Sequence, residues 1–166
     1  MYLPEEGKVV NLTPPAVKSS AGVSAVYVEL DKYQHVDFVM QFGSCSSIAS
    51  DVVTMKQATS VSGSGSSSLA VNGYYHNRTA LGSSSIANDT LTRVAKSSMS
   101  SSGKKFKLAS NSVSNQVYVI PVDAAMLADG KKAAGIAVGT LGKCALAISA
   151  ILSGPRYASQ SPPSAL

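Results

Sequence analysis

Two histidines are the residues of this chain best suited to acid–base chemistry. His35 lies two residues before Asp37, and on a strand this spacing puts both side chains on one face. A hydrolytic triad also needs an activated serine, and the sequence has no G-x-S-x-G elbow leading into a helix. Neither His35 nor His76 has a partner at the spacing of metal ligands. We therefore predict that His35 and Asp37 form a polar pair on the wet face of a strand, and we predict no catalytic, cofactor-binding or metal site.

Two tyrosines precede His76 and could take part in ligand binding. Tyr74 and Tyr75, together with Arg78, have the residue types of a sugar-stacking or partner-binding patch. Strand alternation would instead bury one tyrosine and expose its neighbour. We favour the alternating arrangement and keep the binding patch as the alternative.

A run of serine and glycine over residues 62–68 is the part of the chain that most resembles a phosphate loop. Phosphate-binding loops need a following helix, and the Walker type ends in Lys-Ser or Lys-Thr. Here no lysine closes the run, and residues 68–75 have the pattern of a strand. We predict a flexible surface loop and no small-molecule substrate.

The two cysteines, Cys45 and Cys144, are far apart in sequence and match no metal spacing. In a reducing cytosol both are expected to remain thiols, and a bridge formed after release from the cell is the alternative. Cys144 is in register with Leu146 and Ile148, which makes it a candidate core residue.

Composition restricts the classes of partner. The formal net charge is +5, yet the lysines form only two short runs, at 104–107 and 131–132, without stacking aromatics or a recognition helix. Nucleic-acid binding is therefore not expected. Charged residues make up 14% of the chain, whereas about a quarter is usual for a soluble domain, so much of the surface must be neutral. A neutral surface is typical of a protein that works in an assembly.

No membrane association is expected. The N-terminus lacks the basic start and apolar run of a signal peptide. The most apolar stretch, residues 133–152, is interrupted by glycines and by Lys143, whereas a membrane helix needs about 20 uninterrupted apolar residues.

A two-residue hydrophobic period runs through most of the chain and predicts short strands. It is clearest over residues 144–152, where the strict alternation outweighs the helix preference of alanine. Residues 117–120 are apolar on both faces and predict a central strand covered on both sides. Residues 123–127 predict one helical turn capped by Asp123. Further strands are expected within residues 25–30, 36–42, 51–58, 68–75, 90–96, 104–108, 116–122 and 134–138.

The predicted fold is therefore all-β: a β-sandwich or jelly-roll-like barrel of about eight or nine short antiparallel strands. Prolines at 4, 14 and 15 indicate an irregular N-terminal arm over residues 1–22, and Pro162 and Pro163 indicate an extended tail over residues 154–166. The sandwich domain itself is expected over residues 23–153.

Four ordered segments carry a family resemblance: residues 30–36, 53–70, 117–127 and 151–166, the last ending in Pro163-Ser164-Ala165-Leu166. In this order they resemble a family of small tailed-bacteriophage structural proteins usually encoded close to the major capsid gene. The resemblance implies a virion component without enzymatic activity.

The function expected from this resemblance is capsid decoration or cementing. The protein would be made in the host cytoplasm, bind the major capsid protein on the outer shell and associate with its own copies as a dimer or trimer. Extended arms would reach neighbouring subunits, and the lattice would add avidity. The alternatives are a neck, tail or head-fibre-base protein, or a carbohydrate-binding module for host attachment.

Overall fold

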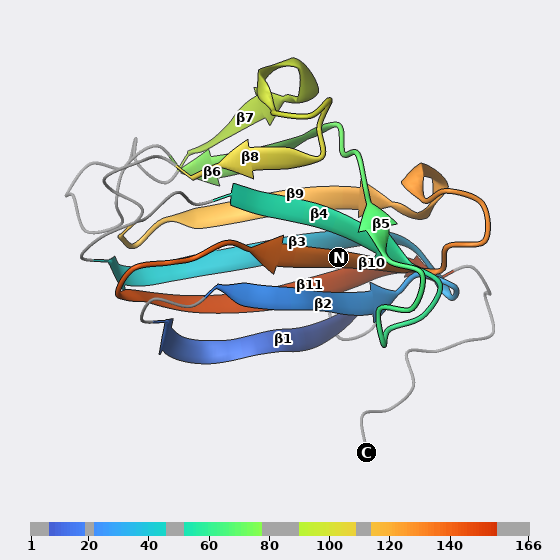
Figure 1. Ribbon diagram of the computed structural model, residues 1–166, viewed down its shortest axis with the longest axis horizontal. Helices are drawn as coiled ribbons and strands as arrows, with labels where there is room; N and C mark the ends of the chain where they lie inside the picture. The colour runs from blue at the N-terminus through green and yellow to red at the C-terminus, as the bar shows by residue number, and fades with distance from the viewer. Residues whose placement is uncertain (1–6, 19–21, 46–51, 78–89, 109–113, 156–166) are drawn as a thin grey trace.

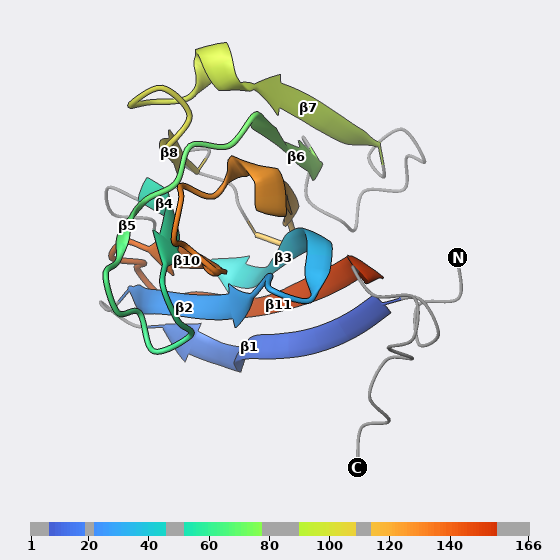
Figure 2. The same ribbon diagram turned by 90° about the vertical axis from the view of Figure 1, so that its right-hand side faces the viewer.

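The computed structural model describes residues 7–18, 22–45, 52–77, 90–108 and 114–155. These residues form eleven strands in two antiparallel sheets that pack face to face (Figures 1 and 2). The strands are β1 (Gly7–Lys18), β2 (Val23–Glu29), β3 (Tyr33–Cys45), β4 (Val52–Ala58), β5 (Ser67–Ser68), β6 (Gly73–Asn77), β7 (Leu91–Ala95), β8 (Lys105–Lys107), β9 (Val117–Asp123), β10 (Ala133–Val138) and β11 (Cys144–Pro155). The predicted all-β sandwich is confirmed, and the two sheets do not close into a barrel.

The larger sheet has six strands in the order β1-β11-β3-β9-β6-β7. The second sheet has the path β2-β10-β4-β5, and β8 pairs with β4 beside it. Consecutive strands usually lie in different sheets, so most neighbours within a sheet are distant in sequence. The longer central strands alternate between buried and more exposed residues, as β9 and β11 do, because the inner face of each sheet is covered by the other sheet.

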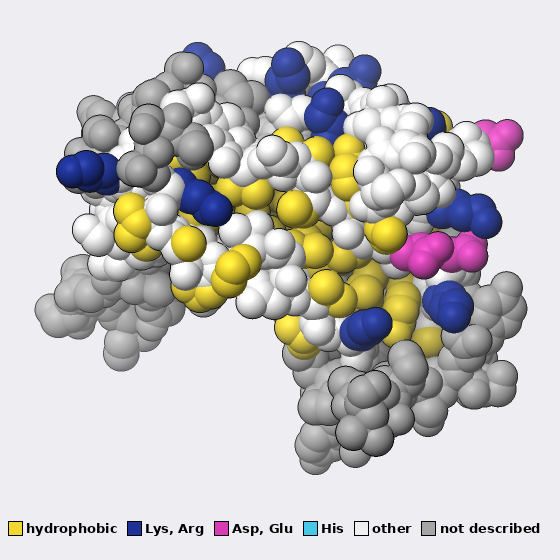
Figure 3. Space-filling model, turned by 60° about the horizontal axis from the view of Figure 1, so that its bottom comes forward, with side chains coloured by type: hydrophobic (Ala, Val, Ile, Leu, Met, Phe, Trp, Pro, Cys, Tyr) yellow, Lys and Arg dark blue, Asp and Glu magenta, His cyan; other side chains and the backbone are white. Residues whose placement is uncertain are grey.

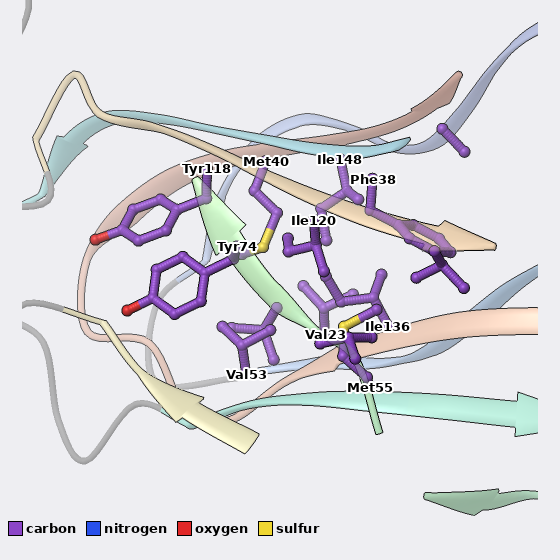
Figure 4. Close-up of a cluster of buried hydrophobic side chains, with 14 of the residues drawn as sticks. Val23, Phe38, Met40, Val53, Met55, Tyr74, Tyr118, Ile120, Ile136 and Ile148 are labelled. Carbon is purple, nitrogen blue, oxygen red and sulfur yellow. The ribbon is translucent and has the colours of Figure 1, made fainter. Parts of the chain in front are cut away.

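The core fills the space between the inner faces of the two sheets. Figure 4 shows side chains of both sheets meeting there, among them Phe38, Met40 and Ile148 from one sheet and Met55 and Ile136 from the other. All five are completely buried. Tyr74, Phe106 and Tyr118 extend this core as a row of aromatic rings, with 4.0 Å between the ring centroids of Tyr74 and Phe106.

The N-terminal segment differs from the prediction. Residues 7–18, expected within an irregular arm, form strand β1, which pairs with β11. Pro14 and Pro15 are accommodated because β1 is an edge strand, where a missing amide hydrogen costs no ladder bond on the open side. The register shifts between Asn11 and Thr13 and again between Thr13 and Ala16, so the second irregularity spans the prolines.

Three local predictions also change. Residues 68–75 form two pieces, β5 and β6, instead of one strand. In β9 only one face is buried, because Val117 and Val119 lie on the outer face and remain partly exposed. The turn after β9 is a 3-10 turn over Ala124–Met126, and the Asp123 side chain does not cap it.

The C-terminal strand β11 ends at Pro155, which pairs with Tyr33. The remainder of the expected tail, residues 156–166, lies outside the described residues, as do residues 1–6 of the expected arm.

Candidate functional site

The outer face of the six-stranded sheet is the most distinctive surface of the molecule. Residues directly opposite one another on antiparallel strands share a face, so the strand register defines its composition. One row crosses the sheet through Val9, Ile151, Asp37 and Pro121, and the next through Asn11, Ser149, Val39, Val119, Tyr75 and Arg93. A third row contains Ala147, Gln41 and Val117.

This face is apolar and nearly free of charge in its middle. Its aliphatic side chains are half-buried or exposed, and the edge residues Val9 and Val17 are 54% and 67% exposed. In these register rows the charged side chains are Asp37, on the interior strand β3, and Arg93, on the edge strand β7. A face with aliphatic side chains and few charges to desolvate is suited to contact with another protein.

A shallow hollow of about 580 Å³ lies on this face where β1, β11, β3 and β9 meet. Its rim includes Pro15, Gln41, Val117, Ala145 and Ala147. Small alanine side chains on β11 leave this depression between the larger side chains of the neighbouring strands. Its lining suits an aliphatic or proline side chain from a partner protein.

The predicted polar pair lies at the other end of the same face. His35 Nε2 is 3.1 Å from an Asp37 carboxylate oxygen, which confirms that the two side chains share a side of strand β3. A third residue, Asp123, places a carboxylate oxygen 2.7 Å from His35 Nδ1. Asp123 reaches His35 because β9 pairs with β3 in the register that puts these two residues opposite each other.

The two carboxylates favour the protonated form of His35. Burial of the imidazole by itself lowers the pKa, because it disfavours the charged ring. The hydrogen bonds and negative charges of Asp123 and Asp37 outweigh this effect, so the pKa of His35 lies above its usual value of 6.5. When His35 is protonated, the result is a charge cluster of one imidazolium between two carboxylates.

This cluster is poorly arranged for general base catalysis. Ser153 lies directly opposite His35 on β11, which brings Ser, His and Asp side by side in three adjacent strands. Both ring nitrogens of His35, however, are hydrogen-bonded to carboxylates, so neither is available to accept a proton from a serine hydroxyl. The described part of the chain contains no group of three or more His, Cys, Asp or Glu residues arranged to hold a metal ion.

The two tyrosines alternate as predicted. Tyr74 is buried, and burial raises the pKa of its hydroxyl, whereas Tyr75 is partly exposed on the outer face. His76 points to the core side, where its ring stacks on Tyr118 at a centroid distance of 5.4 Å. Arg78 lies outside the described residues. Tyr74 therefore cannot provide the exposed ring that a two-tyrosine sugar platform needs.

The serine and glycine run folds back over the second sheet. Tyr27 lies between the loop and the sheet: a Cβ added at Gly63 would be 3.0 Å from its ring, and one added at Gly135 would be 2.4 Å away. The Tyr27 hydroxyl is 2.6 Å from Ser66 Oγ, and Lys131 Nζ donates to the Gly65 carbonyl. The run thus covers a tyrosine. It follows a strand but leads into β5, where a phosphate loop would lead into a helix.

The cysteines differ from the expected thiols. Cys45 and Cys144 lie opposite each other on β3 and β11, with a Cα–Cα distance of 4.1 Å, and form a disulfide. Cys144 is fully buried, which confirms its assignment to the core. The bridge lies directly beside the apolar hollow and fixes the two strands that form its floor.

Comparisons of the chain with protein-family models, with curated proteins and with solved structures found no match in any of the three. No helix within the described residues has the length and hydropathy needed to span a bilayer.

Proposed function

We propose that this protein is a non-enzymatic structural component of a tailed-bacteriophage virion, a decoration or cement protein that binds the major capsid protein on the outer shell. The observation that supports this proposal is the apolar, weakly charged outer face of the six-stranded sheet. The phage assignment itself comes from the family resemblance of the sequence.

The chemistry of this face fits a protein partner. Burying an apolar surface contributes about 25 cal/mol per Å² removed from water, and the register rows bring only two charged side chains, Asp37 and Arg93, whose desolvation would oppose it. The hollow beside the disulfide would receive one protruding side chain, in the way that anchor residues fill pockets at the centre of interfaces. Strands β3 and β11 are the longest neighbours in the sheet and give the face a rigid base.

Avidity strengthens such a contact on a capsid. A shell presents many identical sites, so a decoration protein that binds as an oligomer engages several of them at once. The positioning of His35 between Asp37 and Asp123 adds a polar margin at one end of the apolar face, as the rim of a protein interface requires.

The role is tested first by copy number. Quantitative mass spectrometry of purified virions would compare this protein with the major capsid protein. A copy number close to that of the major capsid protein supports decoration of the shell. A small fraction of it moves the protein to the neck, tail or fibre base, and absence from the particle overturns the proposal.

The binding face is tested with a matched pair of variants. Ala147 and Ala137 are both half-buried alanines, on the outer faces of the six-stranded and the five-stranded sheet respectively. Ala147→Glu places a charge in the apolar face and is expected to weaken binding to undecorated shells by at least about tenfold, since an unpaired buried charge costs more than about 1.4 kcal/mol. Ala137→Glu is the control and should bind normally. Equal binding by both variants would contradict the assignment of the face.

A further inference from the structure

The free edge of strand β2 is a second contact surface. β2 is the terminal strand of its sheet, paired with β10 on one side, and within the described residues nothing pairs with its other side. An unpaired edge exposes a row of backbone donors and acceptors that invites another strand.

The other long edge strand, β1, is protected more strongly than β2. β1 contains Pro14 and Pro15 and two register shifts, and lysines occur near both of its ends. Such features prevent edge-to-edge pairing. β2 contains neither proline, glycine nor lysine, its single charge, Glu29, is at its last position, and it has one register shift against β10, between Val26 and Val23. β2 is therefore the edge of the sandwich best suited to accept a strand.

The backbone of β2 has N–H and C=O groups that face away from β10 and can pair with another strand. The amide of Leu30, just after β2, donates to the carbonyl of Lys132, just before β10, so Leu30 directs its backbone groups toward β10. Successive residues of a strand point their backbone groups in opposite directions, so Tyr27 and Glu29 direct theirs away from β10, and the register shift between Val26 and Val23 interrupts this alternation beside Ala25. These are the groups that an added strand would meet.

We infer that β2 pairs antiparallel with β2 of a second copy of this chain, forming a two-fold dimer with one continuous sheet. The register that we infer is centred on Val26, the middle residue of β2. It places the partner's Tyr27, which directs its backbone groups outward, opposite Ala25 at the register shift. It also keeps the two Glu29 carboxylates at opposite ends of the paired strands, opposite Val23, so no like charges meet.

Side-chain burial favours the same arrangement. β1 and β2 run along one side of the sandwich (Figure 2), and Figure 3 shows hydrophobic side chains gathered in the middle of that side, with lysine and arginine side chains away from its centre. Val10, Leu12 and Val26 are only partly buried although they pack against the core. A second copy placed along β2 would cover these three partly buried side chains. The inference does not depend on the capsid role, because it rests only on the edge strand.

Sedimentation velocity over a range of protein concentrations tests the dimer. The wild type is expected to sediment as a dimer. Ala25→Lys, a charge on the free edge of β2, should raise the dissociation constant at least about tenfold, as edge lysines do. Thr92→Lys makes the same kind of change on β7, an edge strand of the six-stranded sheet, which does not contain β2. It should leave the dissociation constant unchanged.

Cross-linking tests the register. Directly opposite residues have Cβ atoms about 4.5–5.5 Å apart, so Val26→Cys should form a disulfide-linked dimer under mild oxidation. Ser24→Cys should not, because the two-fold separates its copies by about four residues along the strand, roughly 13 Å. A monomer at all concentrations, or a dimer broken by Thr92→Lys and not by Ala25→Lys, would overturn the inference. A dimer that Ser24→Cys links and Val26→Cys does not would overturn the register.

Discussion

Reduction of the Cys45–Cys144 disulfide should destabilise the protein strongly. The bridge joins residues 99 positions apart, so it closes most of the sandwich into one loop. In the chain-entropy account a loop of about 100 residues stabilises the folded state by about 4.7 kcal/mol, because the bridge restricts the unfolded chain. With a urea m-value of about 2 kcal/mol per M, the unfolding midpoint should fall by about 2 M.

The assay is urea unfolding followed by far-ultraviolet circular dichroism, since the chain has no tryptophan. The wild type is measured with and without dithiothreitol, and the double variant Cys45→Ser, Cys144→Ala is measured under both conditions. Alanine is chosen at 144 because that side chain is completely buried and a serine hydroxyl there would add its own cost. The double variant should match the reduced wild type and should not respond to dithiothreitol.

Two results would refute this reasoning. If thiol titration of the purified, air-oxidised protein finds two free thiols, the bridge does not form and the prediction from redox compartment holds instead. If the bridge forms but its reduction leaves the midpoint unchanged, restriction of the unfolded chain is not what the bridge contributes.

Three further changes test other parts of the structure. Because the folded-state pKa of His35 is raised, its contribution to stability should be complete below the unfolded pKa of about 6.5 and lost as pH rises through the folded pKa; urea midpoints between about pH 5.5 and 8.5 should show this fall in the wild type and less of it in Asp123→Asn. An equal fall in both would exclude the ion cluster as its origin. Gly135→Ala should cost about 1–3 kcal/mol in urea unfolding, since the new methyl group would overlap the Tyr27 ring, and Tyr27→Ala in the same chain should recover part of that loss. Phe106→Ala should cost about 3–5 kcal/mol, because it removes a buried ring stacked on Tyr74; a cost below about 1 kcal/mol would mean that β8 is not docked on the core.

The strands were predictable wherever one face is buried and the other is wet. In β11 the residues from Cys144 to Leu152 alternate without exception, and both sequence and structure place the even-numbered ones in the core. β1 was missed for a physical reason. Its pattern is weak because it lies at an edge, and its prolines, which normally argue against a strand, are tolerated there.

The candidate site was predictable only in its local part. His35 and Asp37 are two residues apart on one strand, so their contact follows from strand geometry. Asp123 is 88 residues from His35, and its role depends on the pairing of β3 with β9, for which the sequence carries no local signal. The sequence pattern predicted Asp123 as a helix cap, but the Asp123 carboxylate bonds to the ring of His35 instead, and this hydrogen bond is charge-assisted when the ring is protonated. The disulfide was missed for the same reason, since the register of β3 against β11 brings the two cysteines together.

Two surfaces of the protein contain few charged side chains. The middle rows of the six-stranded sheet's outer face contain no lysine or glutamate, and β2 carries one charge, at its end. These two surfaces belong to different sheets and use different chemistry: side-chain contact across a face in one, and backbone hydrogen bonds along an edge in the other. In a dimer through β2, the outer face of the six-stranded sheet therefore remains free in each copy and can bind a shell. Ala25→Lys should then weaken shell binding only through lost avidity, whereas Ala147→Glu should weaken it even for the monomer. If Ala147→Glu abolished dimerisation as well, the two surfaces would be one, and the edge-paired dimer would have to be replaced by a face-to-face one.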